Sequence, residues 1–188
     1  MDITFLTAAD ATPLVKTLIS KKGVIEKIPY PHVLNFNSTT LSVDTLEQFA
    51  SEVAKFSDQG SCLLKGNTSY RLVNQSRAGS TDANKATEFL VLDIDGLPIG
   101  EHAVKQLPSL IQRVVDAMPK AFRGVSYLVQ YSASSGVYTS SLSAHLFFML
   151  DTEVPPPLIK LLMRQINLNT PLFLDNMTLS RTNTVLRY

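Results

Sequence analysis

Two aspartates, Asp93 and Asp95, directly follow the apolar run 89–92. Successive side chains of a strand alternate between its faces, so both carboxylates are expected on one side while Ile94 points into the core. Two like charges beside apolar residues are costly to desolvate, and a divalent cation relieves that cost. The spacing therefore indicates a metal site, and a turn with two solvated carboxylates is the alternative.

A second polar group precedes the apolar run 146–150. Ser143 and His145 are expected on one face of that strand, and Ser134 and Ser135 lie in the loop before it. A histidine beside several hydroxyl groups is suited to contact a phosphate. A hydrogen-bonded structural role is the alternative for His145.

A third carboxylate, Asp175, follows the apolar run 172–174, and Arg181 and Arg187 lie downstream of it. A third aspartate would complete a two-metal site, and arginines offer planar donors to phosphate oxygens. Taken singly, each of these three residues is equally consistent with ordinary surface charge.

The segments that carry these motifs alternate between strand and helix patterns, which predicts an α/β or α+β class. Helices are expected at residues 11–22, 44–56, 108–118 and 155–167, and strands at 61–65, 89–95, 125–132, 144–150 and 172–175. The second helix is expected to begin with Asp44 and Glu47 as an acidic capping box. A turn is expected at residues 96–98, and the polar segment 66–85 is expected to form a long loop.

Composition bounds the function without identifying it. The formal net charge of +1 gives no overall signature of a nucleic-acid binder, although separated carboxylates and cations would cancel in such a total. Cys62 is the single cysteine, which excludes an internal disulfide and fits a reducing compartment. Without a signal peptide or an apolar run of about 20 residues, the chain is expected to be cytoplasmic and to have no membrane role.

The order of the motifs resembles that of the archaeo-eukaryotic primase superfamily, in particular the phage and plasmid primase-polymerases that are often fused to helicases. That family has an apolar strand ending in Asp-x-Asp, then Ser-x-His entering an apolar strand, then an apolar run followed by Asp, as residues 65–188 do. The resemblance implies that Asp93, Asp95 and Asp175 bind two Mg²⁺ or Mn²⁺ ions. It also implies that His145 contacts the triphosphate of the incoming nucleotide.

The resemblance extends more weakly to other residues. Ser143, Ser134 and Ser135 are expected near the nucleotide phosphates, and Arg181 and Arg187 look like the basic residues that often follow the third motif. Arg77, in the loop ahead of the acidic strand, is a further expected contact for nucleotide or template. The sequence departs from the family at Gly136, since the family usually places glycines close to the histidine.

The architecture implied by the resemblance is an α+β catalytic core. It would have an N-terminal α/β lobe, an RRM-like lobe and an active site in the cleft between them. Residues 1–188 would form one primase-polymerase domain of a larger replication protein. Its reaction would join NTPs or dNTPs on a single-stranded DNA template, with a fused or associated helicase as a further partner.

Two other functions are consistent with these residues. A haloacid-dehalogenase-like phosphatase also has an apolar strand followed by Asp-x-Asp-Gly, but residues after Gly96 lack its later Gly-Asp-x-x-x-Asp motif. A non-catalytic RRM-like or replication-initiator module would instead stack bases on aromatics such as Tyr127, Tyr131 and Phe147.

Overall fold

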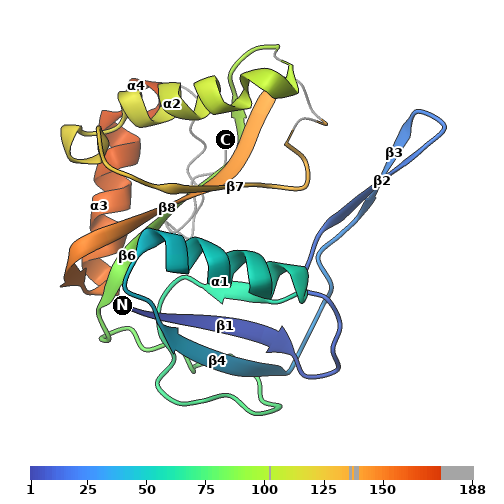
Figure 1. The fold of residues 1–188 in the computed structure, drawn as a ribbon, viewed down its shortest axis with the longest axis vertical. Coiled ribbons are helices and arrows are strands. Elements are labelled where there is room, and N and C mark those ends of the chain that lie inside the picture. Colours follow the sequence, from blue (N-terminus) through green and yellow to red (C-terminus); the bar gives the residue numbers. More distant parts are fainter. Residues whose placement is uncertain (102, 136, 138–139, 175–188) are drawn as a thin grey trace. The chain divides into compact units, whose positions relative to one another are not determined.

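The computed structural model describes residues 1–101, 103–135, 137 and 140–174, and it has the mixed α+β class that the sequence predicts (Figure 1). The elements are β1 (Asp2–Ala8), β2 (Thr17–Lys21), β3 (Val24–Ile28), β4 (Phe36–Ser42), α1 (Leu46–Asp58), β5 (Cys62–Leu64), β6 (Thr87–Pro98), α2 (Leu107–Ala117), β7 (Leu128–Tyr131), β8 (Ser141–Val154), α3 (Pro156–Asn169) and α4 (Pro171–Leu174). Short 3-10 turns occupy Val104–Gln106 and Lys120–Phe122.

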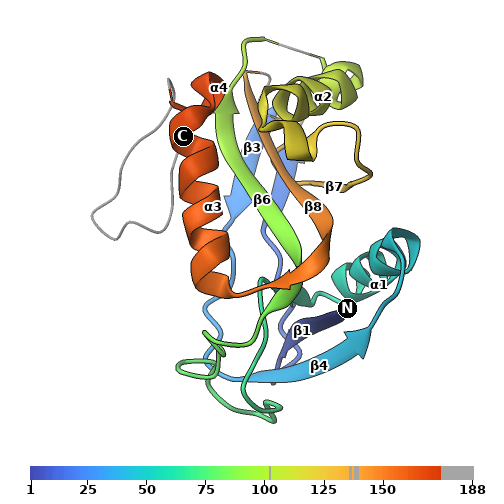
Figure 2. The same cartoon turned by 90° about the vertical axis from the view of Figure 1, so that its left-hand side faces the viewer.

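The chain divides into two compact units. Unit 1 contains residues 1–90 and 149–156, and unit 2 contains residues 91–148 together with the chain from residue 157 onward. Two long strands, β6 and β8, contribute residues to both units (Figure 2).

The main sheet of unit 1 has the order β4-β1-β5, with antiparallel pairing on both sides of β1. Alternation along β1 sends Phe5 towards α1, where its ring stacks on that of Phe56 with centroids 4.1 Å apart. On the other face, Leu6 packs in a buried cluster with Phe36 and with Leu72 of the loop 66–85. Because both faces of β1 are covered, this strand forms the centre of the unit 1 core.

Helix α1 confirms the second predicted helix, with Phe49, Val53 and Phe56 buried. Its cap lies one residue later than the sequence pattern suggested. The hydroxyl of Thr45 accepts a hydrogen bond from the backbone amide of Gln48 at 3.2 Å. The side chain of Gln48 in turn accepts one from the Asp44 amide at 2.7 Å, so the cap is a Thr45–Gln48 pair.

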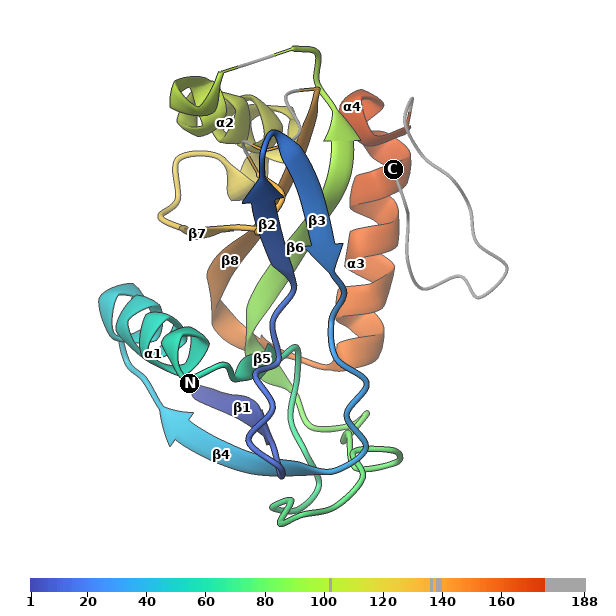
Figure 3. The ribbon, with the colours of Figure 1, turned by 90° about the vertical axis from the view of Figure 1, so that its right-hand side faces the viewer.

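The first predicted helix, at residues 11–22, is wrong, because the chain forms a β-hairpin from β2 and β3 (Figure 3). The turn consists of Lys22 and Gly23, whose φ angles of 50° and 78° are both positive. Two consecutive positive φ angles are the geometry of a two-residue hairpin turn, not of a helix end. The glycine expected to stop a helix therefore reverses a strand.

The second three-stranded sheet has the order β6-β8-β7, with β8 at its centre. Strand β7 runs antiparallel to β8 and pairs Gln130 with His145. One face of β8 packs through Phe148, whose ring lies 5.1 Å from that of Phe122 and 5.5 Å from that of Tyr127. Helices α2 and α3 confirm two predicted helices, and α2 buries Leu107, Leu110, Ile111, Val114 and Val115.

The predicted strand at residues 172–175 is also wrong over its described part. Pro171–Leu174 form the short helix α4, which contacts α2, and Phe173 is fully buried. Proline is favourable at the first position of a helix, where its missing N–H has no partner to lose. Asp175, the last residue of the predicted strand, lies outside the described residues.

Candidate functional site

The two aspartates lie on the exposed face of β6. Asp93 and Asp95 are exposed. Leu92 before them and Ile94 between them are buried, with 3% and 2% of their surface exposed. The alternation expected from the sequence is therefore present. The predicted turn at residues 96–98 is wrong, because β6 continues to Pro98 and the acidic pair lies inside the strand instead of at its end.

A glycine bulge directly follows the acidic pair. Gly96 has a φ of 75°, which is the left-handed region that glycine occupies without steric cost. Leu97 is fully buried although Ile94, three residues earlier, is buried too, so the alternation shifts by one residue at Gly96. An extra residue of this kind is what a β-bulge inserts into one strand of a pair. The bulge lets Leu97 enter the core while Asp93 and Asp95 stay exposed.

Ser143 of β8 holds this bulge. The backbone amide of Gly96 donates a hydrogen bond to the Ser143 hydroxyl oxygen at 2.9 Å. The Ser143 side chain is itself largely buried, and its hydroxyl proton is still able to serve as a donor. Ser143 is predicted to lie near nucleotide phosphates. In the structure its hydroxyl contacts the backbone beside the acidic pair.

His145 lies next to the acidic pair. Its Nε2 is 3.1 Å from Oδ1 of Asp93, and both side chains are partly exposed, at 33% and 47%. Cross-strand pairing places Gln130 of β7 directly opposite His145 on the same face. A carboxylate, an imidazole and an amide therefore form a polar row across β6, β8 and β7.

The loop after β7 folds back onto β8. The hydroxyl of Ser135 donates to the backbone carbonyl of Ser143, which also accepts from the Ser132 amide at 3.1 Å. The hydroxyls of Ser134 and Ser132 are 2.9 Å apart. These contacts hold Ser134 and Ser135 beside β8, the strand that carries His145.

The remaining predicted residues belong to other parts of the chain. Arg77 lies in the loop 66–85 of unit 1, where its carbonyl accepts hydrogen bonds from the amide and hydroxyl of Ser80. Asp175, Arg181 and Arg187 lie outside the described residues.

The exposed carboxylates fit a hard divalent cation by their chemistry. Within residues 1–101, 103–135, 137 and 140–174, no group of three or more His, Cys, Asp or Glu side chains is arranged to hold a metal. Mg²⁺ does not require such a cage, because it keeps several waters and is usually bound by one or two carboxylates plus substrate phosphates. Two oxygen-donor side chains on an open strand face match that mode of binding.

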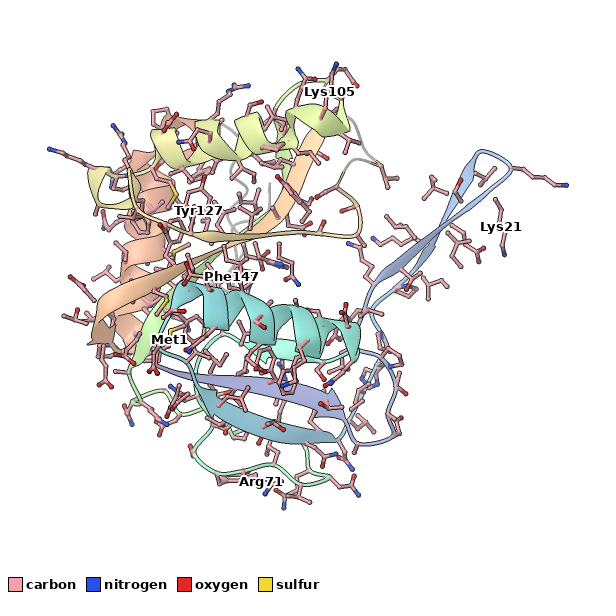
Figure 4. All side chains as sticks on the ribbon, viewed as in Figure 1. Met1, Lys21, Arg71, Lys105, Tyr127 and Phe147 are labelled. Atoms are coloured by element: carbon pink, nitrogen blue, oxygen red, sulfur yellow. The ribbon has the colours of Figure 1, made fainter. Side chains whose placement is uncertain are left out.

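The aromatic residues that a base-stacking module would need do not share one exposed face. Phe147 is 3% exposed and lies on the same face as His145, while Tyr127 packs against Phe148 on the opposite face (Figure 4). Burial raises the pKa of Tyr127 and of Tyr131, with a smaller contribution from Asp116 in the case of Tyr127. The expected stacking platform is therefore incomplete in the described strands.

Unit 1 contains a cavity of about 190 Å³ that includes none of the predicted site residues. Its lining includes Asn67 and Thr87, whose buried Oδ1 and Oγ1 atoms have no hydrogen-bond partner among the described residues. A polar cavity of this size has room for several waters, which would satisfy both atoms.

Comparison of the chain with protein-family models, with curated proteins and with solved structures found no match in any of the three. Among the helices of the described residues, none combines the length and apolar character that crossing a bilayer requires.

Proposed function

We propose that this chain is a template-dependent nucleotidyltransferase of the archaeo-eukaryotic primase type. The observation that carries the proposal is that Asp93 and Asp95 share the exposed face of β6, with the imidazole of His145 3.1 Å from Asp93. An acidic pair and a histidine, separated by some fifty residues of sequence, thus meet on adjacent strands. The same three residues carry the resemblance to that superfamily.

The chemistry of the proposal is phosphoryl transfer between nucleotides. Two Mg²⁺ or Mn²⁺ ions would supply charge stabilisation and lower the pKa of the attacking hydroxyl. Asp93 and Asp95 would hold them, together with Asp175. The oxygens of the triphosphate and of water would complete the coordination, which explains why two exposed carboxylates on β6 suffice as a starting set.

His145 would act on the Asp93 carboxylate as well as on nucleotide phosphates. An Nε2–H donor at 3.1 Å restricts the rotation of the carboxylate and fixes which of its oxygens faces the ligand. Ser143, Ser134 and Ser135 would support binding of the nucleotide phosphates, and Ser143 would do so through its hydrogen bond with the Gly96 amide.

The finer features of the resemblance belong to the same proposal. These are the two-lobed catalytic core with an RRM-like lobe, the single-stranded DNA template, the NTP or dNTP substrate, a fused or associated helicase and a cytoplasmic location. Arg77, Arg181 and Arg187 would contact nucleotide or template through phosphate oxygens.

Calorimetric titration with a nucleotide, with and without Mn²⁺, tests the proposal directly. Wild-type protein should bind the nucleotide only when Mn²⁺ is present. Asp93→Asn and Asp95→Asn should each abolish this Mn²⁺-dependent binding. Asp151→Asn is the matched control, because Asp151 is an exposed aspartate of β8 outside the polar row. Incorporation of labelled nucleotides on a single-stranded template, with and without a primer, should likewise be retained by wild type and Asp151→Asn and lost in Asp93→Asn and Asp95→Asn.

Three outcomes would overturn the proposal. Metal-dependent binding or incorporation that survives both substitutions would remove the proposed site. Hydrolysis of a small phosphate ester that depends on Asp93, without incorporation, would identify a phosphatase. Binding of single-stranded DNA without any metal-dependent nucleotide affinity would identify a non-catalytic module.

A further inference from the structure

The β2–β3 hairpin is exposed along its whole length. Every residue of β2 and β3 is at least partly exposed, and all five residues of β3 are exposed. Figures 1 and 3 show the two strands leading away from β1 and β4 of the same unit. An isolated two-stranded ribbon is only marginally stable in water. Packing against another molecule would stabilise it, so the exposed hairpin is suited to binding.

The ribbon concentrates positive charge. Residues 16–28, which we call the β2–β3 ribbon, contain four of the 17 basic residues of the chain and one of its 16 acidic residues. The basic residues are Lys16, Lys21, Lys22 and Lys27, and the acidic residue is Glu26. The ribbon therefore carries a charge of +3, whereas the rest of the chain carries −2. The nearly neutral total conceals a basic projection.

The register separates these charges onto two faces. Pairing of Leu18 with Lys27, and of Ser20 with Ile25, places Lys27 on a face without an acidic residue. The opposite face carries Glu26, whose carboxylate lies 3.3 Å from the ammonium of Lys21. The charges of Lys21 and Glu26 cancel. The net charge of +3 therefore comes from Lys27 and from Lys16 and Lys22, which lie outside the paired residues.

The remaining lysines extend the charge to both ends of the ribbon. Lys22 is in the turn, with a φ of 50°, and Lys16 directly precedes β2. Figure 4 shows the neighbouring Lys21 at the end of the ribbon, with its side chain in the open. Since a five-residue strand is roughly 17 Å long, lysines lie near both ends of a ribbon of about that length.

We propose that the β2–β3 ribbon binds the phosphate backbone of a nucleic-acid duplex through Lys16, Lys22 and Lys27. The major groove is about 12 Å wide and admits a two-stranded ribbon, and lysines neutralise phosphates without reading the bases. Single-stranded bases are the less suitable ligand, because residues 16–28 contain no aromatic side chain for stacking. Residues 16–28 include none of the residues of the proposed active site, so the inference does not depend on the proposed function.

Fluorescence anisotropy with a labelled 20-base-pair DNA duplex and the corresponding single strand, in EDTA, tests this surface. The variant Lys16→Gln/Lys22→Gln/Lys27→Gln should bind the duplex at least about tenfold more weakly at low salt, and its salt slope should fall by about one per lysine. The matched control is Lys105→Gln/Lys120→Gln/Lys160→Gln, which removes the same charge at three exposed lysines of unit 2. It should bind like wild type, and so should the ribbon variant with arginine at all three positions.

Circular dichroism of each variant establishes that a loss of binding is not a loss of folding. The proposal is overturned if wild type fails to bind the duplex, if the control loses as much affinity as the ribbon variant, or if the single strand is preferred. It is also overturned if the ribbon substitutions release the protein from vesicles of anionic lipid while duplex affinity stays unchanged. Because EDTA excludes metal-dependent nucleotide binding, these outcomes are independent of those that test the proposed function.

Discussion

Nε2 of His145 lies 3.1 Å from Oδ1 of Asp93, so the imidazole of β8 holds a carboxylate of β6 across the sheet. A contact of this kind fixes the orientation of a carboxylate before any ligand arrives. This orienting role and direct contact with a nucleotide differ in their effect on metal affinity.

If His145 orients Asp93, His145→Ala should weaken Mn²⁺ affinity by roughly tenfold or more even without nucleotide. His145→Gln retains an N–H donor and should recover part of that affinity. Electron paramagnetic resonance of free Mn²⁺ measures both, with His32→Ala, an exposed histidine of unit 1, as control. Unchanged Mn²⁺ affinity combined with weaker nucleotide binding would instead restrict His145 to the phosphates.

Ser143→Ala should destabilise the fold by about 1–3 kcal/mol, because the Gly96 amide then loses its acceptor in a partly buried position. Urea unfolding measures the difference. Ser141→Ala, at a half-buried position two residues earlier on the same face of β8, should cost less than about 0.5 kcal/mol. Equal effects for the two substitutions would show that the bulge does not depend on the Ser143 hydroxyl.

Gly60→Ala should be among the most destabilising small substitutions in unit 1. A Cβ at Gly60 would lie 2.8 Å from Cβ and 2.9 Å from Cα of Pro13, and the φ of 72° is itself unfavourable for alanine. The left-handed conformation costs about 1–2 kcal/mol and the overlap about 1–3 kcal/mol more. Gly23→Ala has a similar φ of 78° with no atom within 4 Å, so it should show only the first cost. Thermal unfolding of both variants compares them.

Thr45→Ala should destabilise α1 by about 1 kcal/mol, because the cap donor of Gln48 loses its acceptor. Asp44→Ala should have a much smaller effect, since only the backbone of Asp44 takes part in the cap. Urea unfolding of the two variants distinguishes the observed cap from the one that the sequence pattern suggests. A larger loss of stability for Asp44→Ala than for Thr45→Ala would identify Asp44 as the cap residue instead.

The sequence predicted well those features that depend on local alternation. The exposed faces of Asp93 and Asp95, and the buried face of α1, follow from side-chain periods of 2 and 3.6 residues. The contact between His145 and Asp93 cannot be predicted from side-chain alternation, because it depends on which strands become neighbours in the sheet. Strand order is set by long-range packing, which periodicity along one strand does not encode.

The errors in the fold have local causes. Apolar residues at positions 14, 18 and 19 fit a helical spacing, yet β-branched Thr17 and Ile19 and the turn at Lys22–Gly23 favour the hairpin. The run 172–174 is too short for its period to distinguish strand from helix. The pattern at Gly96 predicts a turn at the end of a strand, but a bulge uses the same residue and lets the strand continue.

Two strands are shared between the compact units, and this has a practical consequence for dissecting the protein. The chain leaves unit 1 within β6, returns to it within β8 and departs again at the start of α3. No single cut therefore yields a fragment that contains all of unit 1 and nothing else. Separating the units would therefore require relinking the chain instead of truncating it.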